Sequence, residues 1–292
     1  MRAKMTYELS GKTIVVTGAT SGIGLATVRM LVQSGAFVIG VGRSESRNQN
    51  AMVQVNSGAT KGDAVYLLAD LSKQEQVNDL CKDIRRVLRN RGFSHLDALV
   101  NNAGVYLGKK HMTEQEIEMT FVVNHLAPFI LTHGMMPLLQ RADHGRVLTV
   151  SSYSHRTTPL NLGRISNPKP YFGLLAYKRS KLCNVLFTHA LNRKIEGMTA
   201  FAVDPGLVNT AIASKASQGP SHWVWRKRRL KGTTPDVPAK TILYLVGERE
   251  IDISKGVYIK DFKPIEPSRK SQRVDLADAL WEMSCQLTGI DW

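Results

Sequence analysis

Short apolar runs alternate with longer amphipathic stretches along most of the chain. The runs are rich in valine, isoleucine and leucine, a pattern typical of strands buried on both faces. In the stretches between them, apolar residues recur every three or four positions, as they do on one face of a helix. The predicted strands are 12–17, 37–41, 64–68, 96–100, 146–150, 199–203 and 256–259. The predicted helices are 24–33, 73–88, a part of 114–139, 174–195, 238–246 and 275–287.

This alternation predicts the fold class. Parallel strands need crossover connections, and helices between successive strands supply them. We therefore expect an α/β fold with a doubly wound parallel sheet of the Rossmann type. No internal repeat, low-complexity tract or linker divides the 292 residues, so we expect a single domain over 1–292.

Two long connections interrupt the alternation. The first, 154–171, contains three prolines, and the second covers 211–238. Connections of this length in a compact domain are usually functional or disordered. We predict that they line a substrate pocket above the carboxyl ends of the strands, with a substrate lid at about 207–238.

The composition is that of an ordinary globular protein. Hydrophobic residues make up 43% and charged residues 22%, which argues against global disorder and against a fibrous repeat. The most apolar segment, 121–139, contains two prolines, two histidines and an asparagine, so we expect a buried helix rather than a membrane span. The eight histidines lack metal-ligand spacing, and we predict no metal site.

The chain shows no secretory leader, and its three cysteines are odd in number and far apart. This pattern fits a reducing compartment, and we expect a cytoplasmic protein. The net charge is +15, and residues 226–231 include five basic side chains that follow Trp223 and Trp225. We interpret this segment as a solvated edge of the lid, with peripheral contact to an anionic membrane surface as the alternative. No nucleic-acid recognition motif accompanies the charge, so we predict no nucleic-acid partner.

A glycine-rich turn follows the first predicted strand. It reads Thr17-Gly18-Ala19-Thr20-Ser21-Gly22-Ile23-Gly24 and leads into a predicted helix. Glycines let the backbone approach a ligand closely, and the free N–H groups at a helix start favour a pyrophosphate. The turn therefore predicts dinucleotide binding.

Further motifs follow in a fixed order along the chain. They are Asn101-Asn102-Ala103-Gly104 after the fourth strand, Asn124 in the next helix, Ser151-Ser152 after the fifth strand, Tyr177 and Lys181 in a helix, and Asp204-Pro205-Gly206 with Thr210 after the sixth strand. Together with the glycine turn, they resemble the short-chain dehydrogenase/reductase superfamily over roughly residues 11–210. The body, the long stretch before Tyr177 and the closing segment 280–284 are most similar to its retinol dehydrogenase-like branch.

Tyr177 and Lys181 are four residues apart and therefore lie on one face of a helix. A neighbouring ammonium and an oxidised nicotinamide favour a phenolate, so we predict that they lower the pKa of Tyr177. Tyr177 would then act as general acid and base while hydride moves to or from the cofactor. Ser152 would hydrogen-bond the substrate oxygen, with Ser151 as the alternative. The resemblance implies that Lys181 also holds the nicotinamide ribose and that Asn124 supports a water-linked proton path.

The end of the second strand indicates the cofactor. An acidic residue there binds the ribose of NAD, whereas an arginine accommodates the 2′-phosphate of NADP. Arg43 stands at this position without a nearby acidic residue before it, which predicts NADP(H). The resemblance implies a cofactor-binding set of Thr17, Gly18, Ser21, Gly22, Ile23, Gly24, Arg43, Asp70, Leu71, Asn101, Ala103, Gly104, Tyr177, Lys181, Pro205, Gly206, Val208 and Thr210.

The sequence thus predicts an NADP(H)-dependent carbonyl reductase or alcohol dehydrogenase. Apolar residues of the two long connections, such as Leu160 and Leu162, suit a lipophilic small-molecule carbonyl or alcohol. The alternative is a non-catalytic, nucleotide-binding regulator or interaction module on the same fold, which would not need Asn124, Ser152, Tyr177 and Lys181 together. The resemblance also implies a homodimer or homotetramer.

Overall fold

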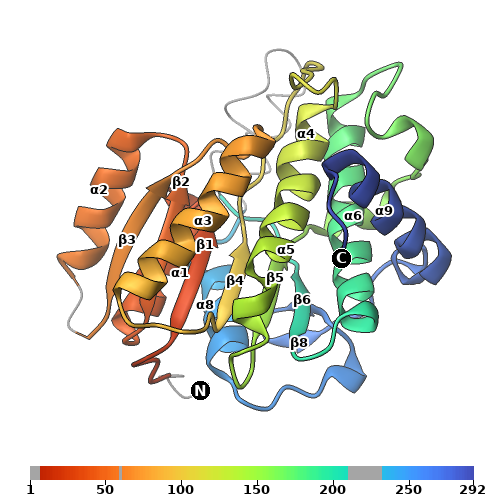
Figure 1. Ribbon diagram of the computed structural model, residues 1–292. Helices are drawn as coiled ribbons and strands as arrows, with labels where there is room; N and C mark the ends of the chain where they lie inside the picture. Colours follow the sequence, from red (N-terminus) through yellow and green to blue (C-terminus); the bar gives the residue numbers. More distant parts are fainter. Residues whose placement is uncertain (1–6, 59–60, 210–231) are drawn as a thin grey trace.

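A single twisted sheet organises the structure, a computed structural model that describes residues 7–58, 61–209 and 232–292. The strand order is β3-β2-β1-β4-β5-β6-β7-β8, and every neighbouring pair is parallel except β7 and β8. The order runs outward in both directions from β1 and β4, which makes the sheet doubly wound (Figure 1). The strands are β1 Thr13–Thr17, β2 Phe37–Gly42, β3 Asp63–Leu68, β4 Ala98–Asn101, β5 Arg146–Val150, β6 Thr199–Val203, β7 Tyr258–Lys260 and β8 Lys263–Pro264.

Helices cover both faces of this sheet. They are α1 Gly22–Gln33, α2 Glu45–Asn56, α3 Gln74–Asn90, α4 Met119–Phe121, α5 Ala127–Leu139, α6 Gly173–Lys194, α8 Asp236–Gly247 and α9 Val274–Thr288. One core cluster joins the sheet to α3, α5 and α6, and another joins its opposite face to α1 and α8. Val15 and Val16 of β1 belong to different clusters, because successive side chains along a strand point to opposite faces of the sheet. Val15 belongs to the cluster with α3, α5 and α6, and Val16 belongs to the cluster with α1 and α8. The predicted fold class is confirmed.

The polar helix α2 is an element that the apolar pattern does not predict. Its sequence is mostly polar, and only Asn48, Ala51 and Val55 are buried. The Asn48 amide donates hydrogen bonds to the Gly42 carbonyl at 3.3 Å and to the Leu67 carbonyl at 3.0 Å. A buried asparagine thus replaces an apolar contact here, so the helical period of hydrophobic residues is absent. The short antiparallel strand β8 is also missing from the prediction.

The helix predicted within 114–139 has a break in its regularity. A π-helical segment, Val122–Leu126, joins α4 to α5. The continuous stretch Met119–Leu139 is the one helix of the described residues that is long and apolar enough to cross a membrane. However, 83% of its most apolar 18-residue window is buried inside the protein, as the polar residues within the helix led us to expect.

The two long connections differ in how far the structure describes them. The first is ordered through 3₁₀ turns at Tyr153–Thr157 and Leu162–Arg164, and its Ile165 joins the main core. Of the predicted lid, residues 210–231 lie outside the described residues, and so do Thr210, Trp223 and the basic segment 226–231. Val208 forms a parallel bridge with Thr233 at the described ends of the lid.

Candidate active site

The motif residues converge on one edge of the sheet. Thr17, Asn101 and the Ser151-Ser152 pair stand at or directly after the carboxyl ends of β1, β4 and β5, and Asp204 follows β6. Carboxyl ends of neighbouring parallel strands share an edge, so these residues lie together, and sheets of this kind bind ligands in the groove outside that edge. The helix α6 brings Tyr177 and Lys181 to the same place, because the Lys181 Nζ donates a hydrogen bond to the Val150 carbonyl at 2.9 Å.

The glycine turn between β1 and α1 is shaped by close backbone approaches. Gly18 has a φ of +64°, and a Cβ at this position would lie 2.9 Å from the Ala103 Cα. A Cβ at Gly24 would lie 2.2 Å from the Gly18 carbonyl oxygen. Side chains are therefore excluded at both positions, and the start of α1 at Gly22 faces the groove with bare backbone.

Asn102 fixes this turn to the segment after β4. Its side-chain amide donates to the Thr17 carbonyl at 2.8 Å, and its backbone N–H donates to the Thr17 hydroxyl at 3.1 Å. The Ala103 N–H donates to the same hydroxyl at 3.0 Å. Sequence reasoning gave Asn102 no role, although an asparagine inside a motif is a signal for this kind of backbone pairing.

Asn101 differs from its neighbour. Its side chain is 2% exposed and donates to the Thr132 hydroxyl of α5 at 3.2 Å. The side chain therefore belongs to the core, and only the backbone of Asn101 reaches the groove edge. Alternation along the strand explains the difference, since the side chains of adjacent residues point in opposite directions.

Asn124, Lys181 and Gly104 form a compact cluster at the base of the groove. A Cβ at Gly104 would lie 3.4 Å from both the Asn124 Oδ1 and the Lys181 Nζ. Asn124 accepts a hydrogen bond from the Val105 N–H at 2.7 Å and donates to the Val105 carbonyl at 3.0 Å and the Ser180 hydroxyl at 2.9 Å. Its amide is thus rigidly held, and it stands in the π-helical segment, a feature frequent at functional sites.

Lys181 is a buried cation. Only 3% of the residue is exposed, and burial lowers the pKa of its ammonium from 10.5 to about 8. The ammonium lies 5.6 Å from the centre of the Tyr177 ring. Because little water competes for its N–H groups, this ammonium can donate hydrogen bonds to the oxygens of a bound ligand.

In the protein without cofactor, the pKa of the Tyr177 phenol is raised, not lowered as the sequence analysis predicts. Burial raises its pKa from 10.0 to about 12, a hydrogen bond with the Ser152 side chain lowers it, and the Asp204 carboxylate raises it. The predicted lowering by Lys181 is not seen, because desolvation is the largest effect and Lys181 is not among the groups that shift this pKa. Tyr177 is therefore a protonated phenol at neutral pH.

The structure distinguishes the two candidate serines. Ser151 is 1% exposed, and its hydroxyl donates to the Lys181 carbonyl at 2.8 Å inside the core. Ser152 is only half-buried, accepts a hydrogen bond from the Ser154 N–H at 3.2 Å and bonds to Tyr177. Ser152 therefore stands beside the phenol, and Ser151 links β5 to α6.

This difference gives a paired prediction. Ser152→Ala is expected to lower kcat/KM about 100-fold, the scale seen when one donor to a reacting oxygen is removed. Ser151→Ala is expected to cost about 1 kcal/mol of unfolding free energy with a much smaller kinetic effect, because it removes one buried hydrogen bond. Steady-state kinetics and thermal melts of both variants check this, and the reverse pattern would assign the role to Ser151.

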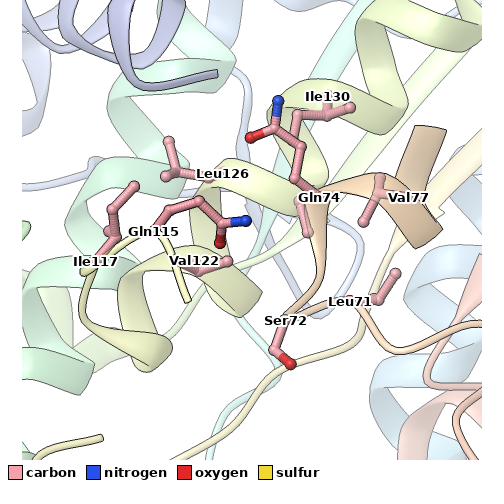
Figure 2. A pocket seen from close by; sticks show the side chains of 10 residues that line it. Leu71, Ser72, Gln74, Val77, Gln115, Ile117, Val122, Leu126 and Ile130 are labelled. Atoms are coloured by element: carbon pink, nitrogen blue, oxygen red, sulfur yellow. The ribbon is translucent and has the colours of Figure 1, made fainter. Parts of the chain in front are cut away.

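Three more predicted cofactor residues, Arg43, Asp70 and Leu71, follow the carboxyl ends of β2 and β3. Arg43 is exposed directly after β2, and the Asp70 carboxylate accepts hydrogen bonds from the Ser72 N–H at 3.0 Å and its hydroxyl at 2.8 Å. Leu71 and Ser72 border a narrow crevice in which the start of α3 faces residues 115–130 (Figure 2). None of the candidate catalytic residues lines this crevice, which the predicted cofactor residue Leu71 borders.

The turn after β6 closes the groove on its other side. Asp204 is buried, and its carboxylate accepts hydrogen bonds from the Gly206 N–H at 3.0 Å and from the Tyr258 hydroxyl at 2.8 Å. Gly206 has a φ of +69°, which favours glycine, and Pro205 precedes it. Val208 follows at the described end of the chain segment, and Thr210 lies beyond it.

These residues fit a dinucleotide. The glycines of the turn, Gly18, Gly22 and Gly24, suit a pyrophosphate, Arg43 suits a phosphate on the adenine ribose, and the Lys181 ammonium suits the hydroxyls of a second ribose. Bound there, such a cofactor would supply hydride chemistry next to Tyr177.

Comparison with known proteins agrees with this geometry. Residues 12–221 match the family model for short chain dehydrogenases. Human retinol dehydrogenase 11 is 31% identical over 291 residues, which cover 98% of this chain and 88% of that protein.

Two solved structures extend the comparison. The crystal structure of an uncharacterised protein from Mycobacterium paratuberculosis has a TM-score of 0.76 and 28% identity, and the match covers 98% of this chain and 96% of that one. A metagenomic short-chain oxidoreductase in complex with NADP has a TM-score of 0.61 and 25% identity, over 87% of this chain and 98% of that one.

Proposed function

Because the chain belongs to the short-chain dehydrogenase/reductase superfamily, in its retinol dehydrogenase-like branch, we propose that it is an NADP(H)-dependent oxidoreductase that interconverts a carbonyl and an alcohol. One observation carries the proposal. The Tyr177 phenol, the Ser152 hydroxyl and the Lys181 ammonium meet at the sheet edge that also holds the glycine turn.

Tyr177 and Ser152 have different parts in the proposed proton transfer. With a pKa of about 12, the Tyr177 hydroxyl carries its proton at neutral pH and can donate it to a carbonyl oxygen that is being reduced. The Ser152 hydroxyl lies beside that phenol, and on substrate binding its single proton can turn from the phenol to the same carbonyl oxygen. The Lys181 ammonium, 5.6 Å from the centre of that ring, would hold the ribose of a bound cofactor. A protonated phenol is the state that carbonyl reduction requires.

Two observations support a lipophilic substrate. Phe172 is 62% exposed and Leu174 41% exposed at the start of α6, the helix that carries Tyr177, and Leu207 is 44% exposed after β6. The name of human retinol dehydrogenase 11 points to a long apolar alcohol as well. We propose a long-chain aldehyde or ketone of this kind as the substrate class.

NADPH oxidation with a panel of carbonyl compounds tests the proposal. The purified protein is mixed with NADPH and with retinal, long-chain and short-chain aldehydes, and aromatic ketones, and the absorbance of NADPH is followed. We expect turnover that is fastest with long apolar aldehydes. Binding of NADPH without turnover of any compound would instead favour a non-catalytic nucleotide-binding regulator.

Cofactor preference gives a separate prediction, supported by the exposed Arg43 and by the NADP in the metagenomic relative. Arg43→Asp is expected to lower kcat/KM for NADPH relative to NADH by about 10- to 100-fold, since a charge-assisted hydrogen bond contributes about 1.5–3 kcal/mol. Arg47→Asp, which changes an exposed arginine in the first turn of α2, is the matched control and should leave the ratio near the wild-type value. Equal ratios in both variants and the wild type would contradict a role for Arg43.

A further inference from the structure

A buried imidazole lies three residues after Ser152 and has no part in the mechanism above. His155 is 1% exposed. Its Nδ1 lies 2.8 Å from the Ser152 carbonyl oxygen, and its Nε2 lies 3.1 Å from the Ser268 backbone nitrogen. The Ser268 N–H can only donate, so Nε2 is the acceptor and Nδ1 carries the proton. This arrangement requires a neutral imidazole, and burial accordingly lowers the pKa of His155.

The imidazole also connects the two turns that border the groove. Its ring packs edge-on against Tyr258 of β7, with ring centres 4.9 Å apart at 70°. The Tyr258 hydroxyl donates to the Asp204 carboxylate, which in turn holds the Gly206 N–H. His155 therefore stands between the turn after β5, which carries Ser152, and the turn after β6.

Two neighbouring contacts fasten the same 3₁₀ turn to a distant part of the chain. The Arg156 guanidinium donates to the Glu266 carbonyl, and the Lys270 Nζ donates to the Thr158 carbonyl at 3.1 Å. Together with the Ser268 bond, they hold residues 155–158 against residues 266–270. His155 differs from Arg156 and Lys270 because its ring also binds the carbonyl of Ser152.

We propose that His155 is a positioning residue, which orients the Ser152 hydroxyl toward Tyr177 by binding the Ser152 carbonyl through Nδ1–H and the Ser268 N–H through Nε2. The inference rests on the proposed function for its kinetic consequence. The Ser152 carbonyl fixes the backbone from which the Ser152 side chain projects, and a hydroxyl displaced by about 1 Å costs on the order of 100-fold in rate.

Two substitutions separate the hydrogen bonds from the packing. His155→Phe keeps an aromatic ring against Tyr258 but removes both bonds. His155→Asn places an amide donor close to the position of Nδ1. We expect His155→Phe to lower kcat 10- to 100-fold with KM for NADPH within twofold of the wild type, on the scale of a misplaced reacting group. His155→Asn should recover most of the loss in kcat.

His189→Asn is the matched control. His189 is a half-buried histidine of α6 whose pKa is also lowered by burial, and it lies outside the groove. This variant should lower the melting temperature without lowering kcat. If the kcat of both His155 variants instead falls only in proportion to their melting temperature, or if folded His155→Phe keeps the wild-type kcat, the proposal is overturned.

A second measurement does not depend on turnover. The Ser154 N–H donates to the Ser152 hydroxyl, so its amide hydrogen exchange reports on the orientation of that side chain. We expect faster exchange across 153–157 in His155→Phe and near-normal exchange in His155→Asn. Unchanged exchange in His155→Phe would overturn the positioning role, whereas the expected exchange in both variants together with no turnover by the wild type would overturn the proposed function alone.

Discussion

Tyr177→Phe is expected to lower kcat for carbonyl reduction by about 10³-fold, because it removes the proton that a general acid supplies. The substitution deletes one oxygen and keeps the ring, which packs edge-on against Tyr106 at 5.9 Å. NADPH affinity should change little, since the glycine turn, Arg43 and Lys181 are untouched. Steady-state kinetics combined with fluorescence titration of NADPH separates the two effects.

Tyr171→Phe is the matched control for this experiment. Tyr171 lies in the connection before α6, and burial also raises its pKa to about 12. Its hydroxyl, however, donates a hydrogen bond to the Leu107 carbonyl at 2.9 Å. We expect its loss to cost about 1 kcal/mol of stability and to leave kcat close to that of the wild type. Turnover that survives in Tyr177→Phe, or falls equally in both variants, would remove Tyr177 from its proposed role.

Lys181→Met is expected to abolish most activity and yet to stabilise the protein without bound cofactor. The pKa of Lys181 falls from 10.5 to about 8 on folding, a difference of 2.5. At about 1.4 kcal/mol for each pKa unit, the buried charge costs roughly 3 kcal/mol at neutral pH. Methionine removes this cost but loses the hydrogen bond to the Val150 carbonyl, which leaves a gain of about 1–2 kcal/mol.

The gain should depend on pH in a defined direction. Between pH 8 and 10.5 the unfolded chain holds more protons on Lys181 than the folded chain, so wild-type stability rises with pH in this interval. Below pH 8 the cost is present in full. The melting temperature of Lys181→Met should therefore exceed that of the wild type at neutral pH, and the excess should shrink as the pH approaches 10.5. A difference that is independent of pH, or a less stable variant, would contradict the buried-cation account.

Most of the fold could be predicted from the sequence because its strands are continuous apolar runs buried on both faces, as Thr13–Thr17 shows. The helix α2 could not, since its contact with the sheet depends on the Asn48 amide rather than on an apolar stripe. The irregular helix at Val122–Leu126 likewise has no hydrophobic signal that separates it from a regular helix.

The candidate site could be predicted as a set of residues but not as a set of orientations. The order of the motifs identified Ser151-Ser152 and Asn101-Asn102, whereas burial and hydrogen bonding showed that Ser152 lies beside Tyr177 and that Asn102 holds the glycine turn. The pKa of Tyr177 also depends on burial, which spacing along a helix does not determine. His155 depends on a contact with Ser268, 113 residues away, that no local pattern indicates.

Some expectations from the sequence stay predictions. Among them are the single domain over 1–292, the cytoplasmic location, assembly into a dimer or tetramer, the roles of the candidate catalytic and cofactor-binding residues, Thr210 included, and the contact of residues 226–231 with a membrane surface. The lid prediction joins them, because residues 210–231 lie outside the described part of the chain.

Isotope transfer tests the central proposal most directly. The protein is incubated with NADPH that carries deuterium at both C4 positions and with the best carbonyl of the panel, and the alcohol is analysed by mass spectrometry. We expect one deuterium on the former carbonyl carbon with the wild type and almost no labelled alcohol with Tyr177→Phe. Unlabelled alcohol, or labelled alcohol formed equally fast by the variant, would contradict hydride transfer assisted by Tyr177.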